Sequence, residues 1–336
     1  MADVRWGLVV PAILAFAAAA TIALIVLLMP LLARYALARP NARSSHRAPT
    51  PQGGGIAIVA VMVLTTAICT HFMSFPFATI ACVLIAAVAL AVVGAIDDII
   101  TLRAMPRLVC QLAASLAVLA VLPDSYRIVD AIPLLVERGV LVIGLVWFIN
   151  LVNFMDGLDW ITVAEVIPLC TGLVVFAILG FIPAYAGIIA CALGGATVGF
   201  APFNRPVARL FLGDVGSLPL GLVLGWMLVI VACNGNIAAA ILMPLYYVAD
   251  ASITLALRLS RGERVWEAHR THYYQRATTN GYTVLGVVSA VFTTNVTLLC
   301  LAVMSALANS VLASGLAIAA GVIVVARLLA RMARPK

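Results

Sequence analysis

The chain has 336 residues, of which 65% are hydrophobic and only 10% are charged, and its mean hydropathy is +1.17. A soluble domain of this size cannot bury so much apolar surface in one core, so the composition excludes a soluble globular protein and indicates a membrane protein. The net charge of +7 therefore reports membrane topology rather than affinity for nucleic acid, and we expect no nucleic-acid partner. The seven cysteines lie in or beside apolar runs without metal-ligand spacing, which is typical of small core residues.

Apolar runs divide the chain into about eleven candidate membrane spans, because a helix needs about 20 apolar residues to cross a bilayer. The first run, Leu8 to Leu32, is longer than a signal-peptide core and has no basic cluster before it, so we expect a retained span. The expected spans cover residues 8–32, 54–73, 76–96, 107–123, 139–154, 160–180, 183–201, 215–233, 237–257, 282–304 and 306–329. The sequence thus predicts an all-α, polytopic helical bundle that forms one domain over residues 1–336.

The basic residues predict how these spans are oriented. With the N-terminus outside and the C-terminus cytoplasmic, seventeen of the twenty Lys and Arg residues lie on the cytoplasmic side. Only Arg5, Arg127 and Arg138 lie outside, which satisfies the positive-inside rule. The same orientation places every polar motif of the chain on the cytoplasmic face, at the ends of different spans.

The first two polar motifs are RSSHRAPTPQGGGIAI and GAIDDI. The first combines His46, Arg47 and Thr50 with three glycines, although a glycine run alone is weak evidence for a site. The second places Asp97 and Asp98 at the end of the third span. A charge beside a membrane span costs free energy unless it forms an ion pair or has a function. The two aspartates therefore either belong to a site or end one helix and cap the next.

The third motif, NLVNFMDGLD, carries four amide and carboxylate groups within ten residues. Asn150, Asn153 and Asp156 recur at a three-residue spacing, which keeps them on one slowly drifting helical face. Gly157 then permits a sharp exit from the helix, and Asp159 follows it. Such groups can cap a helix end, but their density at a membrane boundary favours a functional site.

The fourth motif, FLGDVGSLPLG, places Asp214 between Gly213 and Gly216 at the start of a span. This arrangement predicts a helix N-terminus whose backbone N–H groups face phosphate while the carboxylate holds a cation. A simple N-cap is the competing interpretation.

The fifth motif is the polar loop from Arg258 to Arg276, which contains His269 and His272. The H-E-x-x-H pattern of zinc proteases is absent, and the arginines suit phosphate oxygens better. A solvated basic connector is the alternative. Glu165 and Asp250 lie within spans, so each must be protonated, paired or facing a polar cavity.

Two function classes compete at this point. A membrane enzyme that handles a charged substrate needs carboxylates gathered at one face. A secondary transporter of a charged solute, the alternative, is expected to gather ionisable residues near the membrane midplane on broken, symmetry-related helices. The carboxylate motifs lie at span ends and no internal repeat is evident, which favours the enzyme.

The five motifs, in this order over residues 43–276, resemble the polyprenyl-phosphate N-acetylhexosamine-1-phosphate transferases (glycosyltransferase family 4 type). The resemblance implies transfer of a sugar 1-phosphate from a UDP-sugar donor to undecaprenyl phosphate, releasing UMP and forming a lipid-diphosphate sugar. It also implies a Mg2+ cofactor, for which Mn2+ is an alternative, and an active site on the cytoplasmic face of a bacterial inner membrane. A homodimer remains open.

The residues that match the family, together with their chemistry, give the candidate site. Expected catalytic residues are Asp97, Asp98 and Asp156; expected metal ligands are Asp214 and Asn153; expected substrate-binding residues are His46, Arg47, Thr50, Asn150, Asp159, His269, Arg270 and His272. The spans at about 282–329 lie beyond the motif-bearing core.

The chain departs from the family pattern at two places. Many members repeat Asp-Gly after the Asn/Asp signature, whereas Asp159 is followed here by Trp160. The histidine loop reads HRTHYYQR and lacks the consecutive histidines of the peptidoglycan translocase. Together with PTPQGGG and NFMDG, this loop looks closer to the enzymes that initiate O-antigen or capsule synthesis.

Overall fold

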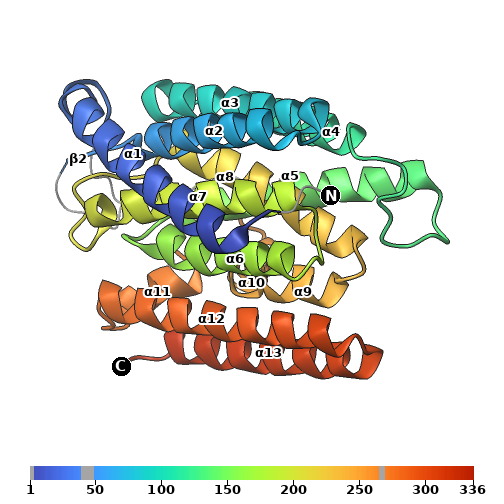
Figure 1. Cartoon of the computed structure of the whole chain (residues 1–336). Helices are drawn as coiled ribbons and strands as arrows, with labels where there is room; N and C mark the ends of the chain where they lie inside the picture. The colour runs from blue at the N-terminus through green and yellow to red at the C-terminus, as the bar shows by residue number, and fades with distance from the viewer. Residues whose placement is uncertain (1–3, 39–48, 265–268) are drawn as a thin grey trace.

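The computed structural model describes residues 4–38, 49–264 and 269–336, and within these ranges the chain is almost entirely helical. A single two-residue pairing, β1 (Leu37–Ala38) with β2 (Thr50–Pro51), is antiparallel. The helices run side by side as a bundle (Figure 1). They are α1 (Trp6–Tyr35), α2 (Gly54–Met73), α3 (Phe77–Ile100), α4 (Ala104–Ala120), α5 (Leu134–Met155), α6 (Ile161–Ile178), α7 (Ala184–Asn204), α8 (Asp214–Cys233), α9 (Ile237–Leu242), α10 (Leu245–Ser260), α11 (Tyr273–Thr279), α12 (Val284–Ala308) and α13 (Val311–Met332).

Nine of the described helices are long and apolar enough to cross a membrane, which confirms the predicted polytopic all-α fold. The other two expected spans differ from the prediction. Helix α4 is apolar but has only 17 residues. The segment expected to cross at 237–257 is broken into α9 and α10, and Pro244 lies at the break, where proline cannot donate a backbone hydrogen bond.

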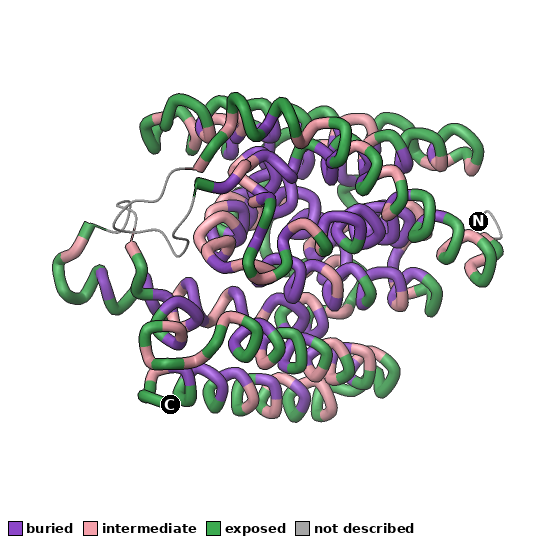
Figure 2. Tube along the Cα trace, turned by 90° about the vertical axis from the view of Figure 1, so that its left-hand side faces the viewer, coloured by how far each residue is buried: buried purple, intermediate pink, exposed green. Residues whose placement is uncertain are grey.

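Helix α8 forms the centre of the bundle. In its most apolar 18-residue stretch, 94% of the residues are buried, whereas in the corresponding stretches of α1 and α13 only 22% are buried. Figure 2 shows the same gradient, with buried residues in the middle and exposed residues on the outer helices. The exposed outer residues are largely apolar, as a lipid-facing surface requires.

Close helix packing near the start of α8 depends on glycine. A Cβ atom at Gly55 would overlap the backbone of Gly216, and one at Gly94 would overlap the carbonyl group of Asp214. The glycine run at the start of α2 therefore has a packing role, because it lets α2 approach the backbone of the fourth motif. Gly94 does the same for α3.

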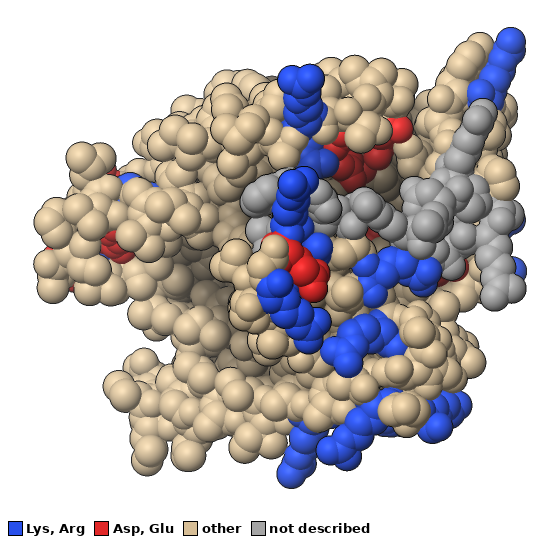
Figure 3. Space-filling view, turned by 180° about the vertical axis from the view of Figure 1, so that it is seen from behind, with Lys and Arg blue, Asp and Glu red and all other residues tan. Residues whose placement is uncertain are grey.

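Successive spans alternate in direction, so the motif-bearing ends of α2, α3, α5 and α8 gather at one end of the bundle (Figure 1). The N- and C-termini lie at opposite ends. Most Lys and Arg side chains visible in Figure 3 lie toward one end of the molecule. We call the end that carries Asp97 and Asp214 the motif end; its assignment to the cytoplasm stays a prediction.

Candidate active site

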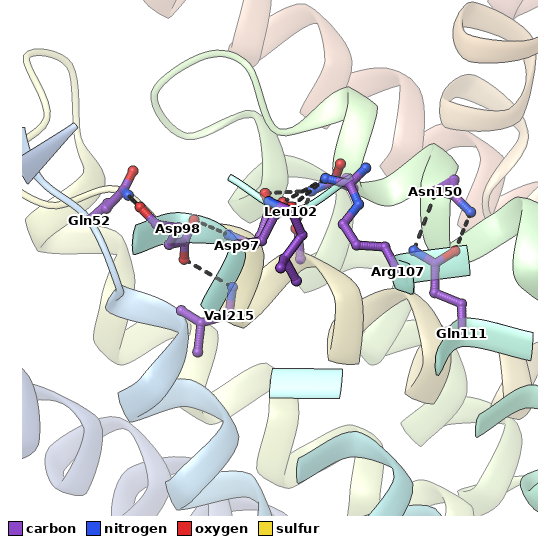
Figure 4. Close-up of polar contacts among 11 residues, drawn as sticks. Gln52, Asp97, Asp98, Leu102, Arg107, Gln111, Asn150 and Val215 are labelled. Carbon is purple, nitrogen blue, oxygen red and sulfur yellow. Dashed lines mark hydrogen bonds and ion pairs between the residues drawn. The ribbon is translucent and has the colours of Figure 1, made fainter. Parts of the chain in front are cut away.

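Asp98 joins the end of α3 to the start of α8. Its carboxylate accepts hydrogen bonds from the backbone N–H groups of Asp214, at 2.9 Å, and Val215, at 3.1 Å (Figure 4). These are the first two N–H groups of α8, which lack partners within the helix. The prediction that these amides face phosphate is therefore wrong, because Asp98 caps them.

Asp97 lies beside Asp98 but points to a different partner. Its carboxylate accepts a hydrogen bond from the backbone N–H of Leu102 at 2.5 Å and forms an ion pair with Arg107 (Figure 4). The same guanidinium nitrogen lies 3.4 Å from Oδ2 of Asp214. One arginine thus serves two of the three aspartates gathered here.

Arg107 is a site residue that the sequence reasoning missed. It lies in the first turn of α4, and in the sequence it counts only as one more basic residue at a cytoplasmic span end. Its position ten residues after Asp97, across a short loop, is the signal that could have identified it. The loop reverses the chain, so the arginine returns to the carboxylates.

Asn153 orients Asp214. Its amide nitrogen donates hydrogen bonds to Oδ1 of Asp214 at 2.7 Å and to Oγ of Ser217 at 2.9 Å. The third and fourth motifs are therefore brought together, as predicted. Only the amide oxygen of Asn153 remains for a cation, and its role as a ligand stays a prediction.

Asp156 follows the last residue of α5 and is half-buried. It accepts a hydrogen bond from the hydroxyl group of Thr162. Burial, together with the negative charges of Asp98 and Asp159, raises the pKa of its carboxyl group to about 7, although the hydrogen bond from Thr162 opposes this rise. Asp156 therefore belongs to the electrostatic neighbourhood of the aspartate cluster.

Two expected substrate-binding residues of the third motif make structural contacts. Asn150 exchanges hydrogen bonds with the buried Gln111 of α4, donating at 2.6 Å and accepting at 3.3 Å (Figure 4). Asp159 accepts a hydrogen bond from the backbone N–H of Ala208 at 3.0 Å, which ties it to the loop before α8. A direct contact of either residue with substrate stays a prediction.

Trp160 takes the place where many family members have glycine, and its backbone is left-handed, with φ of 64°. Few non-glycine residues adopt this conformation. Two hydrogen bonds to the end of α7 hold it: the backbone N–H donates to Asn204 at 2.8 Å and the indole N–H donates to the carbonyl of Ala201 at 2.6 Å. The turn therefore keeps the glycine-like backbone with a bulky side chain.

The first motif contributes its backbone to the site. Thr50 is buried in β2, and Nε2 of Gln52 donates to the carbonyl of Asp98 at 2.8 Å (Figure 4). The N–H groups of Gly53, Gly54 and Gly55 bond to carbonyls of the segment before α8. His46 and Arg47 lie outside the described residues.

Asp250 organises the described part of the histidine loop. This carboxylate is fully buried in α10 and accepts hydrogen bonds from the backbone N–H groups of Tyr273 at 2.9 Å and Tyr274 at 3.1 Å. It also lies 3.3 Å from Nδ1 of His272. The paired state, one of the three alternatives for this intramembrane carboxylate, is the one observed. At Glu165, Asn295 donates a hydrogen bond to Oε2 at 2.7 Å, and the buried Oε1 has no hydrogen-bond partner within the described residues.

The two histidines of the loop differ in exposure. His272 is buried beneath His269, with its ring stacked 4.7 Å from the ring of His269, while Arg270 is exposed. Burial, then electrostatic interaction with His272 and Arg258, lowers the pKa of His269 to about 4. His269 and Arg270 are thus placed to meet a ligand, whereas His272 supports them from within; substrate binding by all three stays a prediction.

Tyr274 connects the histidine loop to the third motif. Its hydroxyl group donates to the carbonyl of Phe154 at 3.0 Å, and a Cβ atom at Gly157 would overlap this hydroxyl. The structure therefore brings the fifth motif against the turn that carries Asp156. This agrees with the expectation that all polar motifs lie on one face.

The cluster fits a hard divalent cation. Its ligands are carboxylate oxygens, and the guanidinium group between Asp97 and Asp214 marks a place that accepts positive charge. Within the described ranges, no three His, Cys, Asp or Glu residues form a metal-binding group. Mg2+ commonly needs only one or two protein carboxylates together with substrate phosphates, so an aspartate pair is sufficient.

Comparisons with known proteins agree with the motif order. The model of glycosyl transferase family 4 matches residues 80–232. The chain is 30% identical over 267 residues to a phospho-N-acetylmuramoyl-pentapeptide-transferase of Symbiobacterium thermophilum, which covers 70% of this chain and 77% of the relative. It is also 30% identical over 212 residues to a decaprenyl-phosphate N-acetylglucosaminephosphotransferase of Mycolicibacterium smegmatis, covering 56% of this chain. The chain spans about half the length of that mycobacterial relative, 52%.

Proposed function

The chain belongs to glycosyl transferase family 4, the polyprenyl-phosphate hexosamine-1-phosphate transferases, and on this premise we propose that it forms a lipid-diphosphate sugar. The donor is a UDP-sugar of the N-acetylhexosamine type, the acceptor is undecaprenyl phosphate, and UMP is released. The product initiates a cell-surface polysaccharide. Relatives named for N-acetylglucosamine and N-acetylmuramoyl-pentapeptide transfer support the hexosamine class.

The observation that carries this proposal is the cluster of Asp97, Asp98 and Asp214 at the motif end, in which Arg107 contacts Asp97 and Asp214 while Asp98 caps α8. Phosphoryl transfer requires charge neutralisation on a diphosphate and in-line placement of the nucleophile. A bound Mg2+ supplies charge neutralisation and orients the diphosphate. Asp97 and Asp214 are the residues that would hold it.

The reaction forms one phosphorus–oxygen bond and breaks another. An oxygen of the acceptor phosphate attacks the phosphorus that carries the sugar, and the bridging oxygen leaves with UMP. The acceptor already carries a charge near −2 at neutral pH, as other phosphate monoesters do, so positioning it matters more than deprotonating it. Arg107 balances the negative charge near the transferred group, and Asp98 fixes the start of α8, so that Asp214 keeps its orientation.

The histidine loop is proposed to bind the donor. His269 and Arg270 lie on the exposed side of a loop that Tyr274 fastens beside Asp156. Arginine forms paired, charge-assisted hydrogen bonds with phosphate oxygens, which suits a diphosphate. This arrangement lets the nucleotide approach from water while the lipid acceptor stays within the bilayer, at the cytoplasmic face of a bacterial inner membrane.

A donor panel tests the proposal. Purified protein is incubated with undecaprenyl phosphate, Mg2+ and one UDP-N-acetylhexosamine at a time, and UMP release and lipid product are measured. We expect equimolar UMP and lipid product with at least one donor. If UDP accumulates instead, the protein transfers the sugar without its phosphate, and the proposed reaction is wrong.

A further inference from the structure

Helix α13, at the edge of the bundle, has two faces of different character (Figure 1). The face that packs against the bundle is buried and follows one side of the helix, through Ala317, Gly321, Val325, Leu328 and Met332. The opposite face is exposed along the length of the helix. This exposed face is open to molecules that surround the protein.

One stripe of the exposed face changes from apolar to basic along its length. Leu316 and Ile323 are 63% and 51% exposed, and the exposed Arg327, Arg331 and Arg334 follow them. The spacings of seven, four, four and three residues keep these side chains on one side of a helix. We call these five residues the α13 stripe.

The change of character falls at the depth where a membrane interface is expected. Helix α13 has 22 residues, so it is about 33 Å long at 1.5 Å per residue. The hydrocarbon core of a bilayer is about 30 Å thick. Leu316 and Ile323 therefore lie at the level of the acyl chains, whereas the arginines at the end of the helix reach the level of the headgroups.

The charges of these three arginines are uncompensated in the described part of the chain. The sequence contains no Asp or Glu after residue 267, and no ion pair among the described residues involves any of the three. The guanidinium group of Arg331 lies over the ring of Tyr282, a contact that does not cancel its charge. Figure 3 shows Lys and Arg side chains along the lower edge of the molecule, at the level where Figure 1 draws α13.

The end of α13 is fastened to the turn between α11 and α12. The amide nitrogen of Asn280 donates to the carbonyl of Met332 at 2.8 Å, and the hydroxyl group of Tyr282 donates to the carbonyl of Arg331 at 3.3 Å. The backbone N–H of Lys336 donates to the carbonyl of Asn280 at 3.0 Å. The arginines therefore project from a fixed surface and not from a free tail.

We propose that the α13 stripe binds an anionic phospholipid, with an acyl chain along Leu316 and Ile323 and the phosphate at the three arginines. Basic residues clustered at the end of a span attract anionic lipids, and guanidinium groups form charge-assisted hydrogen bonds with phosphate oxygens. A soluble anion would leave the apolar part of the stripe unused. A second copy of the chain, packed stripe to stripe, would bring positive charges together without acidic partners.

Lipid binding to the purified full-length protein tests this surface without donor or acceptor. Radiolabelled phosphatidylglycerol is titrated onto the protein in detergent, and phosphatidylcholine with the same acyl chains is the zwitterionic comparison. One variant removes the three charges and a second keeps them: Arg327→Gln/Arg331→Gln/Arg334→Gln and Arg327→Lys/Arg331→Lys/Arg334→Lys. The matched control removes three exposed arginines from three other places: Arg34→Gln/Arg103→Gln/Arg261→Gln.

We expect the glutamine variant of the stripe to raise the Kd for phosphatidylglycerol about tenfold or more, because each basic residue near a membrane surface adds to the attraction of anionic lipid. The lysine variant should restore most of this affinity, and the matched control should bind like the wild type. Phosphatidylcholine should bind weakly to all four proteins. The exposed positions of the substituted side chains make a change in melting temperature unexpected.

Three results would overturn the proposal. If the matched control weakens binding as much as the glutamine variant, the stripe has no special role. If glycerophosphoglycerol, the headgroup without acyl chains, displaces the lipid as well as intact phosphatidylglycerol does, the apolar part is not used. If undecaprenyl phosphate displaces the lipid at lower concentration than phosphatidylglycerol does, the surface serves the acceptor instead. No turnover is measured, so the outcome is independent of the proposed reaction.

Discussion

The carboxylates at two places in this molecule, Asp250 and the aspartate cluster, are satisfied in opposite ways. Asp250 stands alone and is surrounded by donors from its own chain: two backbone N–H groups, the hydroxyl groups of Tyr246 and Thr254, and His272. Asp97, Asp98 and Asp214 lie together, and a single guanidinium group, that of Arg107, pairs with Asp97 and Asp214 but not with Asp98. The first arrangement is complete within the protein, whereas the second keeps excess negative charge.

The difference indicates which carboxylates stabilise the fold and which are available to bind a ligand. A buried carboxylate with several donors fixes the elements that supply them, here the start of α11. Carboxylates held close together repel one another, and a cation relieves that repulsion. We therefore interpret Asp250 as structural and the aspartate cluster as functional, and substitutions at the two places should differ in kind.

The largest effect is expected for Asp214→Asn. The change keeps the shape of the side chain but removes a charge that faces the proposed cation, which contributes several kcal/mol to the transition state, so turnover should fall about a hundredfold or more. The melting temperature should stay close to that of the wild type. Asp130→Asn, an exposed aspartate in the 121–133 connection, is the matched control. Near-normal turnover at saturating Mg2+ would remove Asp214 from the proposed metal site.

Arg107→Gln should change the Mg2+ concentration needed for half-maximal activity and the donor KM in opposite directions. Without the guanidinium group the cluster is more negative, so half-maximal activity should need less Mg2+, while the anionic donor should bind more weakly and its KM should rise. Arg107→Lys keeps the charge and should lie between the variant and the wild type. Steady-state kinetics over a Mg2+ series measures both constants. A parallel rise of the two would show that Arg107 does not compete with the cation.

Asp250→Asn should mainly affect stability. Hydrogen bonds to a charged group contribute about 1.5–3 kcal/mol each, and the amide cannot accept them all, so we expect a lower melting temperature in detergent. The donor KM should rise because His269 and Arg270 lose their support, while turnover at saturating donor should fall less than in Asp214→Asn. A hundredfold loss of turnover with unchanged melting would contradict the structural interpretation.

The smallest effect is expected at the amide pair of Asn150 and Gln111. If Asn150 only joins α5 to α4, then Asn150→Ala and Gln111→Ala should each lower stability by about 1 kcal/mol and leave the donor KM unchanged. Thermal melting and donor kinetics of both variants decide this. A raised KM in Asn150→Ala alone would restore the substrate-binding role that the sequence predicts.

The sequence was sufficient to predict that distant motifs meet, because antiparallel spans of known length bring alternate ends to the same side. It could not show which partner each polar group takes, since that depends on the rotation of each helix and on individual rotamers. Asp98 as the cap of α8 and Arg107 between two aspartates are both of this kind. The break at Pro244 was also missed, because the apolar run continues across it.

Trp160 shows a further limit of sequence reasoning. The resemblance to the family identified it as a departure from glycine, but only the structure shows that the left-handed backbone is kept and that two contacts with α7 hold it. The motif pattern is therefore informative about backbone geometry even where the residue type changes. What the new side chain encloses depends on α12, which lies outside all five motifs.

The fate of the phosphate next to the sugar tests the central claim most directly. UDP-N-acetylhexosamine labelled at this phosphate is incubated with undecaprenyl phosphate, Mg2+ and the purified protein, and the lipid is extracted. We predict that the label enters the lipid fraction with release of unlabelled UMP, and that Asp214→Asn abolishes this transfer while Asp130→Asn does not. Label that remains with the nucleotide, or transfer that is unaffected in Asp214→Asn, would contradict the account.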